Sequence, residues 1–298
     1  MPTSPASPSH ESSAPTVWVE RRVIAYAHQG GAWEGPSSTL DTIERALAGG
    51  ATGIELDVHA TSDGRLVVCH DDTVDRTTAA TGSIASFTYD QLSRLDNAYW
   101  WAPGADVTPG LADDAYPHRG RAPEDHRFGF ALLEEVLEEF PGAILNLDIK
   151  QTAPVVAPYE EALAQLLKRF GCAERVIVAS FLDTATDNFS RYAPEIPTSA
   201  GTLATADFYR SVQAGERPAP MRHVALQVPV SFGDVTLVDE RFVEVAHAEG
   251  LAVHVWTIEV ESEMEELCGI GVDGIITDRP TALVAVLDRL GCAWSPGS

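Results

Sequence analysis

Hydrophobic and polar positions follow two different periods along the chain, and together they predict strands alternating with helices. Apolar runs of about four to eight residues predict buried parallel strands, and apolar residues three or four positions apart predict helices. The run at 22–28, for example, ends in Gln-Gly-Gly, and the helical pattern that follows stops at the glycines of 49–50. The strand segments predicted in this way are 23–28, 53–58, 143–149, 175–181, 196–200, 223–228, 251–257 and 274–277.

Helical segments occupy the gaps between these strands from residue 143 onward. A strand and a helix that repeat eight times within roughly 250 residues have the size and order of a TIM-type (β/α)8 barrel, which belongs to the α/β class. We expect the barrel to fill residues 19–298 and a Ser- and Pro-rich disordered tail to occupy residues 1–18. The predicted helices are 158–170, 183–192, 202–213, 238–249, 260–269 and 280–290.

One segment departs from the parallel pattern because it has the features of a hairpin. Apolar and polar residues alternate along the second predicted strand, so Glu55 and Asp57 share one face. The Asp-Gly pair at 63–64 is typical of a two-residue hairpin turn, and a second strand at 66–69 follows it. Counting back from that turn places His70 opposite Asp57, with the two side chains on the same face. The register therefore predicts that the two carboxylates and this histidine meet.

Residues 72–130 form a long insertion after the hairpin, with a short helix near 88–95 and a loop rich in Pro, Gly and aromatic residues. Long loops in compact domains are often functional, and this one leaves from the active rim of the barrel, so we expect an insertion subdomain that acts as a lid. The aromatic residues at 99–101 either line a pocket or anchor the loop to the barrel surface.

The composition changes this picture mainly through its charge. The formal net charge of the 298 residues is −24, without a run of Lys and Arg, and such a chain repels phosphate backbones. We therefore expect a small-molecule substrate, no nucleic acid and no stable membrane insertion. The sequence shows neither a signal-peptide pattern nor a long apolar segment, which favours a cytoplasmic protein. Four widely spaced cysteines argue against a zinc site and a disulfide framework. The sequence does not indicate an oligomeric state.

Charged side chains gather at the carboxyl ends of the first three barrel strands, where barrel enzymes place their working residues. His28 ends the first strand, Glu55 and Asp57 lie at the end of the second, and Asp148 and Lys150 share a face at the end of the third. Three carboxylates without a cysteine favour a hard divalent cation, Mg²⁺ or Ca²⁺. A lysine and two histidines beside such an ion suit proton transfer and anion stabilisation at a phosphoryl group.

Each of these residues also has a plain structural explanation. An isolated carboxylate near a strand end is usually a solvated rim residue or a helix cap, and Lys150 would then only form an ion pair with Asp148. The coincidence of several such residues on adjoining strand ends favours a functional site. His59 alternates onto the face of Glu55 and is predicted to be structural.

From about Val23 to the C-terminus the chain resembles the glycerophosphodiester phosphodiesterase family. The block from 53 to 78, GIELDVHATSDGRLVVCHDDTVDRTT, is very specific, and the closing GVDGIITDRP nearly so. The other motifs that carry the resemblance are AHQGG at 27–31, PSSTL at 36–40, LDIK at 147–150, VASF at 178–181 and VWT at 255–257.

The resemblance implies a metal-dependent hydrolase that cleaves glycerophosphodiesters to an alcohol and sn-glycerol 3-phosphate. In the route proposed for the family, the glycerol 2-hydroxyl attacks phosphorus, and water opens the resulting cyclic phosphate. Alternatives are a phospholipase-like enzyme acting on another phosphodiester such as a lysophospholipid, a catalytically weakened barrel that binds a phosphorylated ligand, and a barrel enzyme of unrelated chemistry. The implied roles are acid–base catalysis for His28 and His70, metal binding for Glu55, Asp57 and Asp148, and substrate binding for Lys150, Gln29 and Trp256.

The chain departs from the family's usual pattern in three places, which involve four residues. Gln29 stands where the family usually has Arg, and Ser37-Ser38 stands where it has Glu-Asn. An Arg and a Glu are thus absent together, and we expect a neutral Gln/Ser contact to replace a charged pair. Losing a guanidinium would weaken phosphate binding or shift the substrate, because a lysine cannot supply a bidentate fork. Asp148 stands where the family generally has Glu, one methylene longer.

Overall fold

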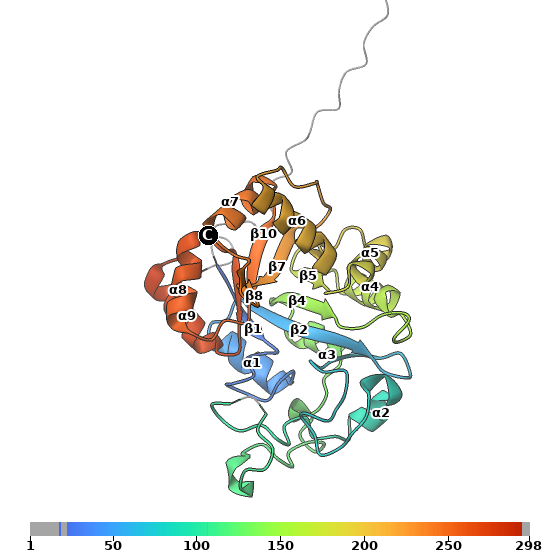
Figure 1. Cartoon of the computed structure of the whole chain (residues 1–298). Helices are drawn as coiled ribbons and strands as arrows, with labels where there is room; N and C mark the ends of the chain where they lie inside the picture. The colour runs from blue at the N-terminus through green and yellow to red at the C-terminus, as the bar shows by residue number, and fades with distance from the viewer. Residues whose placement is uncertain (1–17, 19–22, 106, 294–298) are drawn as a thin grey trace, which may run out of the picture.

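The computed structural model describes residues 18, 23–105 and 107–293, and within them the predicted alternation of strands and helices forms a barrel (Figure 1). Neighbouring parallel strands follow the order β5-β4-β2-β1-β11-β10-β7-β6, and a bridge between Val178 and Thr198 brings the two ends of this order together. The predicted TIM-type fold is therefore confirmed. The strands are β1 (Ile24–His28), β2 (Gly53–Ala60), β4 (Ile144–Ile149), β5 (Val176–Ala179), β6 (Ser199–Ala200), β7 (Ala225–Pro229), β10 (Ala252–Trp256) and β11 (Gly274–Thr277).

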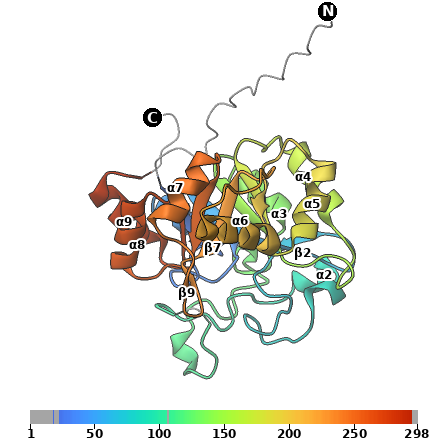
Figure 2. The same ribbon diagram turned by 45° about the horizontal axis from the view of Figure 1, so that its top comes forward.

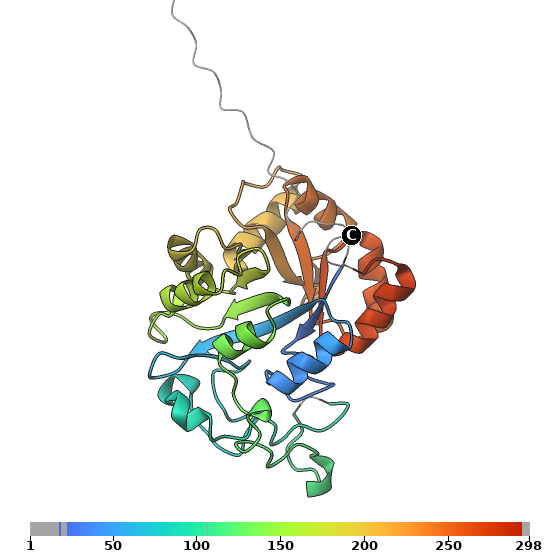
Figure 3. The same ribbon diagram turned by 180° about the vertical axis from the view of Figure 1, so that it is seen from behind.

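Helices surround the strands, as the views from the two sides show (Figures 1 and 3). The sequence patterns gave no helix at 133–139, where α3 connects to β4; it has only seven residues, too few for a clear period. None of the described helices is long and apolar enough to cross a bilayer. The barrel helices are α1 (Leu40–Ala48), α3 (Leu133–Glu139), α4 (Glu160–Arg169), α5 (Asp183–Tyr192), α6 (Thr202–Ala214), α7 (Glu240–Ala248), α8 (Glu261–Ile270) and α9 (Pro280–Leu290).

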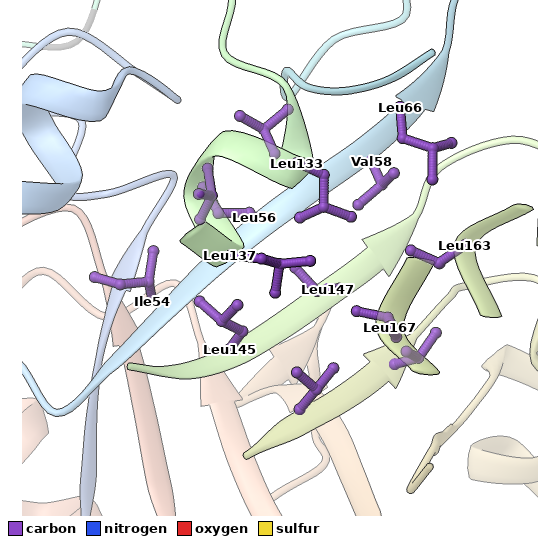
Figure 4. Close-up of a cluster of buried hydrophobic side chains, with 14 of the residues drawn as sticks. Ile54, Leu56, Val58, Leu66, Leu133, Leu137, Leu145, Leu147, Leu163 and Leu167 are labelled. Atoms are coloured by element: carbon purple, nitrogen blue, oxygen red, sulfur yellow. The ribbon is translucent and has the colours of Figure 1, made fainter. Parts of the chain in front are cut away.

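Leucine side chains fill the space between the strands and the helix layer. Leu56 and Leu147 on β2 and β4 pack with Leu137 of α3 and Leu163 of α4, and all four are essentially inaccessible to solvent (Figure 4). Burying a side chain of this size stabilises the fold by about 1.5–3 kcal/mol. These contacts fix β2 and β4 side by side, and the two strands carry the predicted carboxylates.

A second apolar cluster lies inside the barrel and closes its amino-terminal end. Tyr26 of β1 and His254 of β10 are fully buried there, and the ring centroids of Trp18 and His254 are 6.4 Å apart. Trp18 is itself only 1% exposed, although the sequence placed it in the disordered tail. The rest of that predicted tail, residues 1–17, lies outside the described residues.

The hairpin forms, but its predicted register is wrong. The strand β3 (Leu66–Val68) pairs antiparallel with β2, with Val58 opposite Val68, and Thr61 N–H donates to the Arg65 carbonyl at 2.9 Å. The turn therefore has three residues, the last of which is Gly64 with φ +78°. Three-residue hairpin loops place a glycine in this left-handed conformation, so the Asp-Gly signal fits both loop lengths.

The segment between β3 and α3 contains only short helices in its described part and projects from one side of the barrel (Figure 2). Trp100 Nε1 donates to the Thr78 carbonyl and Trp101 Nε1 to the Ala32 carbonyl, at 2.8 and 2.9 Å. Trp101 therefore anchors the segment to the barrel, which is the second of the two alternatives, whereas Trp100 forms a hydrogen bond within the segment. The short elements are η2 (Ile84–Ser86), α2 (Tyr89–Leu92), η3 (Asp113–Ala115) and η4 (His126–Phe128).

Candidate active site

Strand register brings the predicted residues together at the carboxyl ends of the first strands. His28 of β1 pairs with Glu55 of β2, and Asp57 of β2 pairs with Asp148 of β4. Residues at matching positions of parallel strands point to the same face, and here that face is the barrel interior. All three carboxyl residues are less than 9% exposed.

An aspartate from the last strand end holds His28. Its Nδ1 lies 2.7 Å from Asp278 Oδ1, and a carboxylate only accepts, so Nδ1 carries the proton. Gly31 permits this approach, because its φ is +99° and a Cβ there would lie 2.8 Å from Pro280 Cγ. Burial opposes protonation of His28, but the hydrogen bond that His28 donates to Asp278 and the charge of Glu55 outweigh it and raise the pKa of His28 to about 9.

His70 reaches the site by a different route from the predicted one. In the observed register Asp57 faces Cys69, whose N–H donates to the Asp57 carbonyl at 3.0 Å, and β3 has already ended at Val68. The chain then turns and brings the His70 ring to 5.6 Å from the His28 ring, edge to face. His70 therefore lies near the carboxylates, as predicted. The register from which this was predicted is wrong.

Asp71 orients His70 as Asp278 orients His28. The Asp71 carboxylate accepts from His70 Nδ1 at 2.7 Å and from Arg76 Nε at 2.6 Å. Burial alone would raise the pKa of Asp71, but these two hydrogen bonds and the charge of Arg76 lower it to about 2. The aspartate is thus ionised over the whole physiological range.

Lys150 lies between two of the three carboxylates. Its Nζ is 3.0 Å from Asp57 Oδ1 and 3.5 Å from Asp148 Oδ2, so the ion pair with Asp148 that the sequence suggested is the longer of two. Burial alone would lower the pKa of Lys150, but both carboxylates raise it. Burial also raises the pKa of Glu55, and the charge of Asp57 adds to this effect. Burial raises the pKa of Asp148 as well, and the charge of Lys150 offsets this rise only in part.

The donor chemistry of this cluster fits a hard divalent cation. Asp57 Oδ2 and Asp148 Oδ1 are buried and have no hydrogen-bond partner among the described residues. Buried carboxylates need a compensating charge, and oxygen donors are those that Mg²⁺ and Ca²⁺ prefer. In their present positions, no three His, Cys, Asp or Glu side chains of the described chain are arranged to hold a metal ion. The residues therefore supply suitable ligands without a formed cage.

A cavity of about 570 Å³ opens beside these side chains. Seven of the eight predicted site residues line it: His28, His70, Glu55, Asp57, Asp148, Lys150 and Trp256. No described lining residue comes from 71–130, so the predicted lid does not contribute to the wall. Instead, α6 and the small hairpin β8 (Ser231–Phe232) and β9 (Val235–Thr236) lie along the far side.

The eighth predicted residue, Gln29, lies behind His28 and not on the cavity wall. Its Nε2 is 3.2 Å from His28 Nε2, and its Oε1 accepts from Ser37 Oγ at 2.5 Å. The neutral Gln/Ser contact expected from the sequence is therefore present. Arg76 Nη2 approaches the same Gln29 oxygen at 3.4 Å, so a guanidinium remains in this part of the site. His59 is buried away from the cavity, in agreement with its predicted structural role.

The sequence also matches a protein family, independently of the site geometry. The family model described as "Glycerophosphoryl diester phosphodiesterase family" matches residues 28–282. The chain belongs to this family. Its members are phosphoric diester hydrolases, and the strand-end histidines and carboxylates of the cavity all fall within the matched residues.

Several glycerophosphodiester phosphodiesterases are similar to this chain in sequence. A glycerophosphodiester phosphodiesterase from Caldanaerobacter subterraneus is 30% identical over 272 residues, which are 91% of this chain and 100% of that protein. Human glycerophosphodiester phosphodiesterase 1 is 48% identical over 77 residues, 26% of this chain and 23% of its own length.

Solved structures of phosphodiesterases share the fold. A glycerophosphoryl diester phosphodiesterase domain from Mycobacterium tuberculosis superposes with a TM-score of 0.72 at 22% identity, over 90% of this chain and 99% of that one. An Oleispira antarctica phosphodiesterase in complex with the product sn-glycerol-3-phosphate has a TM-score of 0.66 at 23% identity, over 88% of this chain and 96% of that one.

Four site residues escaped the sequence analysis, namely two orienting aspartates and a pair of amides. Asp278 follows the last strand directly and Asp71 follows His70, so the rule that strand ends carry working residues pointed to both. Asn146 and Gln227 form a reciprocal amide pair across the cavity floor, at 3.1 and 3.2 Å. Asn146 was visible as the polar residue in the apolar run of β4, but its partner lies 81 residues away, which no local pattern indicates.

Proposed function

We propose that this chain hydrolyses glycerophosphodiesters to an alcohol and sn-glycerol 3-phosphate by acid–base catalysis between His28 and His70. The observation that carries the proposal is the pair of imidazoles, each held at Nδ1 by its own aspartate, facing one another beside Lys150 and three buried carboxylates. A carboxylate on Nδ1 fixes the tautomer and leaves Nε2 for proton transfer.

The electrostatics assign the two histidines different roles. Asp278 and Glu55 raise the pKa of His28 to about 9, which favours His28 as the residue that donates a proton to the departing alcohol oxygen. His70 accepts the proton of the attacking hydroxyl, which is the glycerol 2-hydroxyl in the route that the family resemblance implies. The new bond from that oxygen to phosphorus forms as the bond to the alcohol breaks, and water then opens the cyclic phosphate with the proton transfers reversed.

The remaining predicted residues bind charge and substrate. Lys150 offsets the negative charge of the phosphoryl group, and its compact ammonium is already directed into the cavity by Asp57. Mg²⁺ or Ca²⁺ held by Glu55, Asp57 and Asp148 would supply Lewis-acid stabilisation of the phosphoryl oxygens. Trp256 is partly buried in the wall, and its ring packs edge to face against Phe181 with centroids 5.5 Å apart, so it offers the glycerol moiety an apolar surface.

A catalytically weakened barrel that only binds a phosphorylated ligand is the second candidate. Such a protein needs Lys150 and a compensating cation but no proton donor and acceptor. The two separate His–Asp pairs, at 2.7 Å each, therefore favour catalysis.

The test is product release from glycerophosphocholine by the purified protein after chelation, with Mg²⁺, Ca²⁺ or Mn²⁺ then restored. Enzymatic detection of sn-glycerol 3-phosphate and of choline distinguishes which ester bond breaks. We expect release of both products in equal amounts, abolished by chelator and recovered with one of the ions. Saturable binding of glycerophosphocholine without any release would support the binding barrel instead.

A further inference from the structure

The cavity has a polar end and an apolar end, and the catalytic groups occupy only the first. Beyond Asp148 and Lys150 the wall runs along β7, α6 and the hairpin β8–β9, where its side chains are mostly hydrocarbon and aromatic. We call this part the apolar wing. It is lined by Phe181, Tyr209, Val228, Phe232, Leu237 and Phe242.

Two aromatic rings of the apolar wing are open to water. Phe232 is 77% exposed and Phe181 is 55% exposed, although both line the cavity. Large exposed apolar groups beside a functional site mark a surface that a ligand covers. A ligand that reaches from the histidines to Phe232 would remove both rings from water.

Charge decides which ligand suits the apolar wing. Every described carboxyl side chain that lines the cavity, namely Glu55, Asp57 and Asp148, lies at the catalytic end. Arg210 lines the apolar wing, but its exposed guanidinium forms an ion pair with Asp207 at 2.8 Å. In addition, Lys150 Nζ lies 6.0 Å from the centre of the Phe181 ring, so the ring already faces a cation. A quaternary ammonium group would find no carboxylate to pair with among the described lining residues of the apolar wing, whereas an uncharged hydrocarbon chain needs none.

We propose that the preferred substrate is a phosphodiester that carries a hydrocarbon chain, which lies in the apolar wing. This inference rests on the proposed function and names the substrate class of the same site. The chain has two chemical sources: an acyl chain on the glycerol, as in a lysophospholipid, or an alkyl leaving alcohol. In both, water cleaves one phosphorus–oxygen bond, and the products are a phosphomonoester and an alcohol.

Substrate comparison tests the proposal below the critical micelle concentration, so that no lipid surface is present. The substrates are glycerophosphocholine, 1-hexanoyl and 1-octanoyl lysophosphatidylcholine, and glycerophospho-octanol. Each methylene removed from water raises kcat/KM by up to about fourfold, so an octyl or octanoyl chain should give at least a tenfold gain over glycerophosphocholine. A higher kcat/KM for the lysophosphatidylcholines identifies an acyl chain on the glycerol, and a higher kcat/KM for glycerophospho-octanol identifies an alkyl leaving alcohol. Equal kcat/KM within twofold for all substrates would overturn the proposal.

A pair of variants on one hairpin locates the effect. Phe232→Ser removes an exposed ring that lines the cavity, and Val235→Ser, at an exposed neighbour that does not line it, is the matched control. The ratio of kcat/KM for the octanoyl substrate to that for glycerophosphocholine should fall at least about fivefold in Phe232→Ser and stay constant in Val235→Ser. Equal ratios in the two variants would place the chain elsewhere and contradict the proposal.

A binding measurement separates this inference from the proposed function. Calorimetry with octyl phosphate and methyl phosphate needs no turnover, so it remains informative if no diester is cleaved with any ion and the proposed function fails. Tighter binding of octyl phosphate by at least tenfold, lost in Phe232→Ser, supports the apolar wing. Equal affinities of the two phosphates refute it.

Discussion

The neutral contact between Gln29 and Ser37 predicts how stability changes when these residues are replaced by Arg and Glu, the residues that the family usually has. Gln29→Arg alone should destabilise the protein, because the side chain is only 4% exposed and Arg76 Nη2 lies 3.4 Å from its oxygen. Two unit charges about 4 Å apart repel by about 4 kcal/mol at an effective dielectric constant of 20. A buried charge without a partner costs about 3–5 kcal/mol in other proteins. We therefore expect a loss of about 3 kcal/mol.

Adding Ser37→Glu should recover most of this loss, since Ser37 Oγ already lies 2.5 Å from the Gln29 side chain. Ser37→Glu alone buries a carboxylate and should also destabilise. The double-mutant cycle should thus give a favourable coupling energy of about 2–3 kcal/mol. Urea unfolding at pH 7.5 measures each variant, and Gln29→Met with Ser37→Ala is the uncharged control, expected to cost about 1 kcal/mol for the lost hydrogen bond.

A Gln29→Arg variant as stable as the wild type, together with no coupling to Ser37→Glu, would refute this reasoning. It would mean that a carboxylate already present pairs with the new guanidinium. Glu55 is the candidate, because its Oε2 accepts the Gln29 backbone N–H at 3.3 Å.

Three further predictions concern the charges around the cavity and the barrel interior. Asp278→Asn removes a charged hydrogen-bond partner worth about 1.5–3 kcal/mol, so NMR titration of the chelated protein should show the pKa of His28 reduced from about 9 by about one to two units; an unchanged titration contradicts the orienting role. His254 is buried and its pKa is lowered to about 3, so only the unfolded state takes up its proton below about pH 6.5, and the wild type loses stability as the pH falls. Urea midpoints from pH 7.5 to 5 should fall less in His254→Leu, and parallel curves would refute this. Lys150→Met should reduce kcat/KM about 10- to 100-fold, mainly through KM, with partial recovery in Lys150→Arg; steady-state kinetics with an unchanged KM would exclude phosphate binding by this lysine.

The strands were predictable because parallel strands that are buried on both faces consist mainly of apolar residues, and β2 and β4 show this most clearly. The carboxyl-end rule then placed His28 and the three carboxylates at this end of the barrel. The hairpin register was not predictable, since the loop length depends on side-chain hydrogen bonds. Thr61 Oγ1 donates to Asp63 at 2.6 Å and accepts from Arg65 N–H at 2.9 Å, which stabilises the three-residue loop.

The positioning residues and the apolar wing depend on contacts between distant segments. Asp278 and His28 are 250 residues apart, so only the closed barrel brings them together. Phe232 lies on a two-residue strand, too short for a period-2 pattern, so no local pattern indicated that it lies beside the cavity. The predicted cover of the site was the segment after β3, whereas no described lining residue comes from 71–130 and the apolar wing is formed by the later half of the chain.

Steady-state turnover of His28→Ala, His70→Ala and the double variant tests the central claim most directly. Each purified variant is compared with the wild type on the diester that the wild type cleaves best, with circular dichroism as the folding control. Loss of a general acid or base costs about 10²- to 10⁴-fold, so each single variant should lose at least a hundredfold in kcat, and the double variant little more. A folded single variant that keeps more than a tenth of the wild-type kcat would contradict acid–base catalysis by this pair.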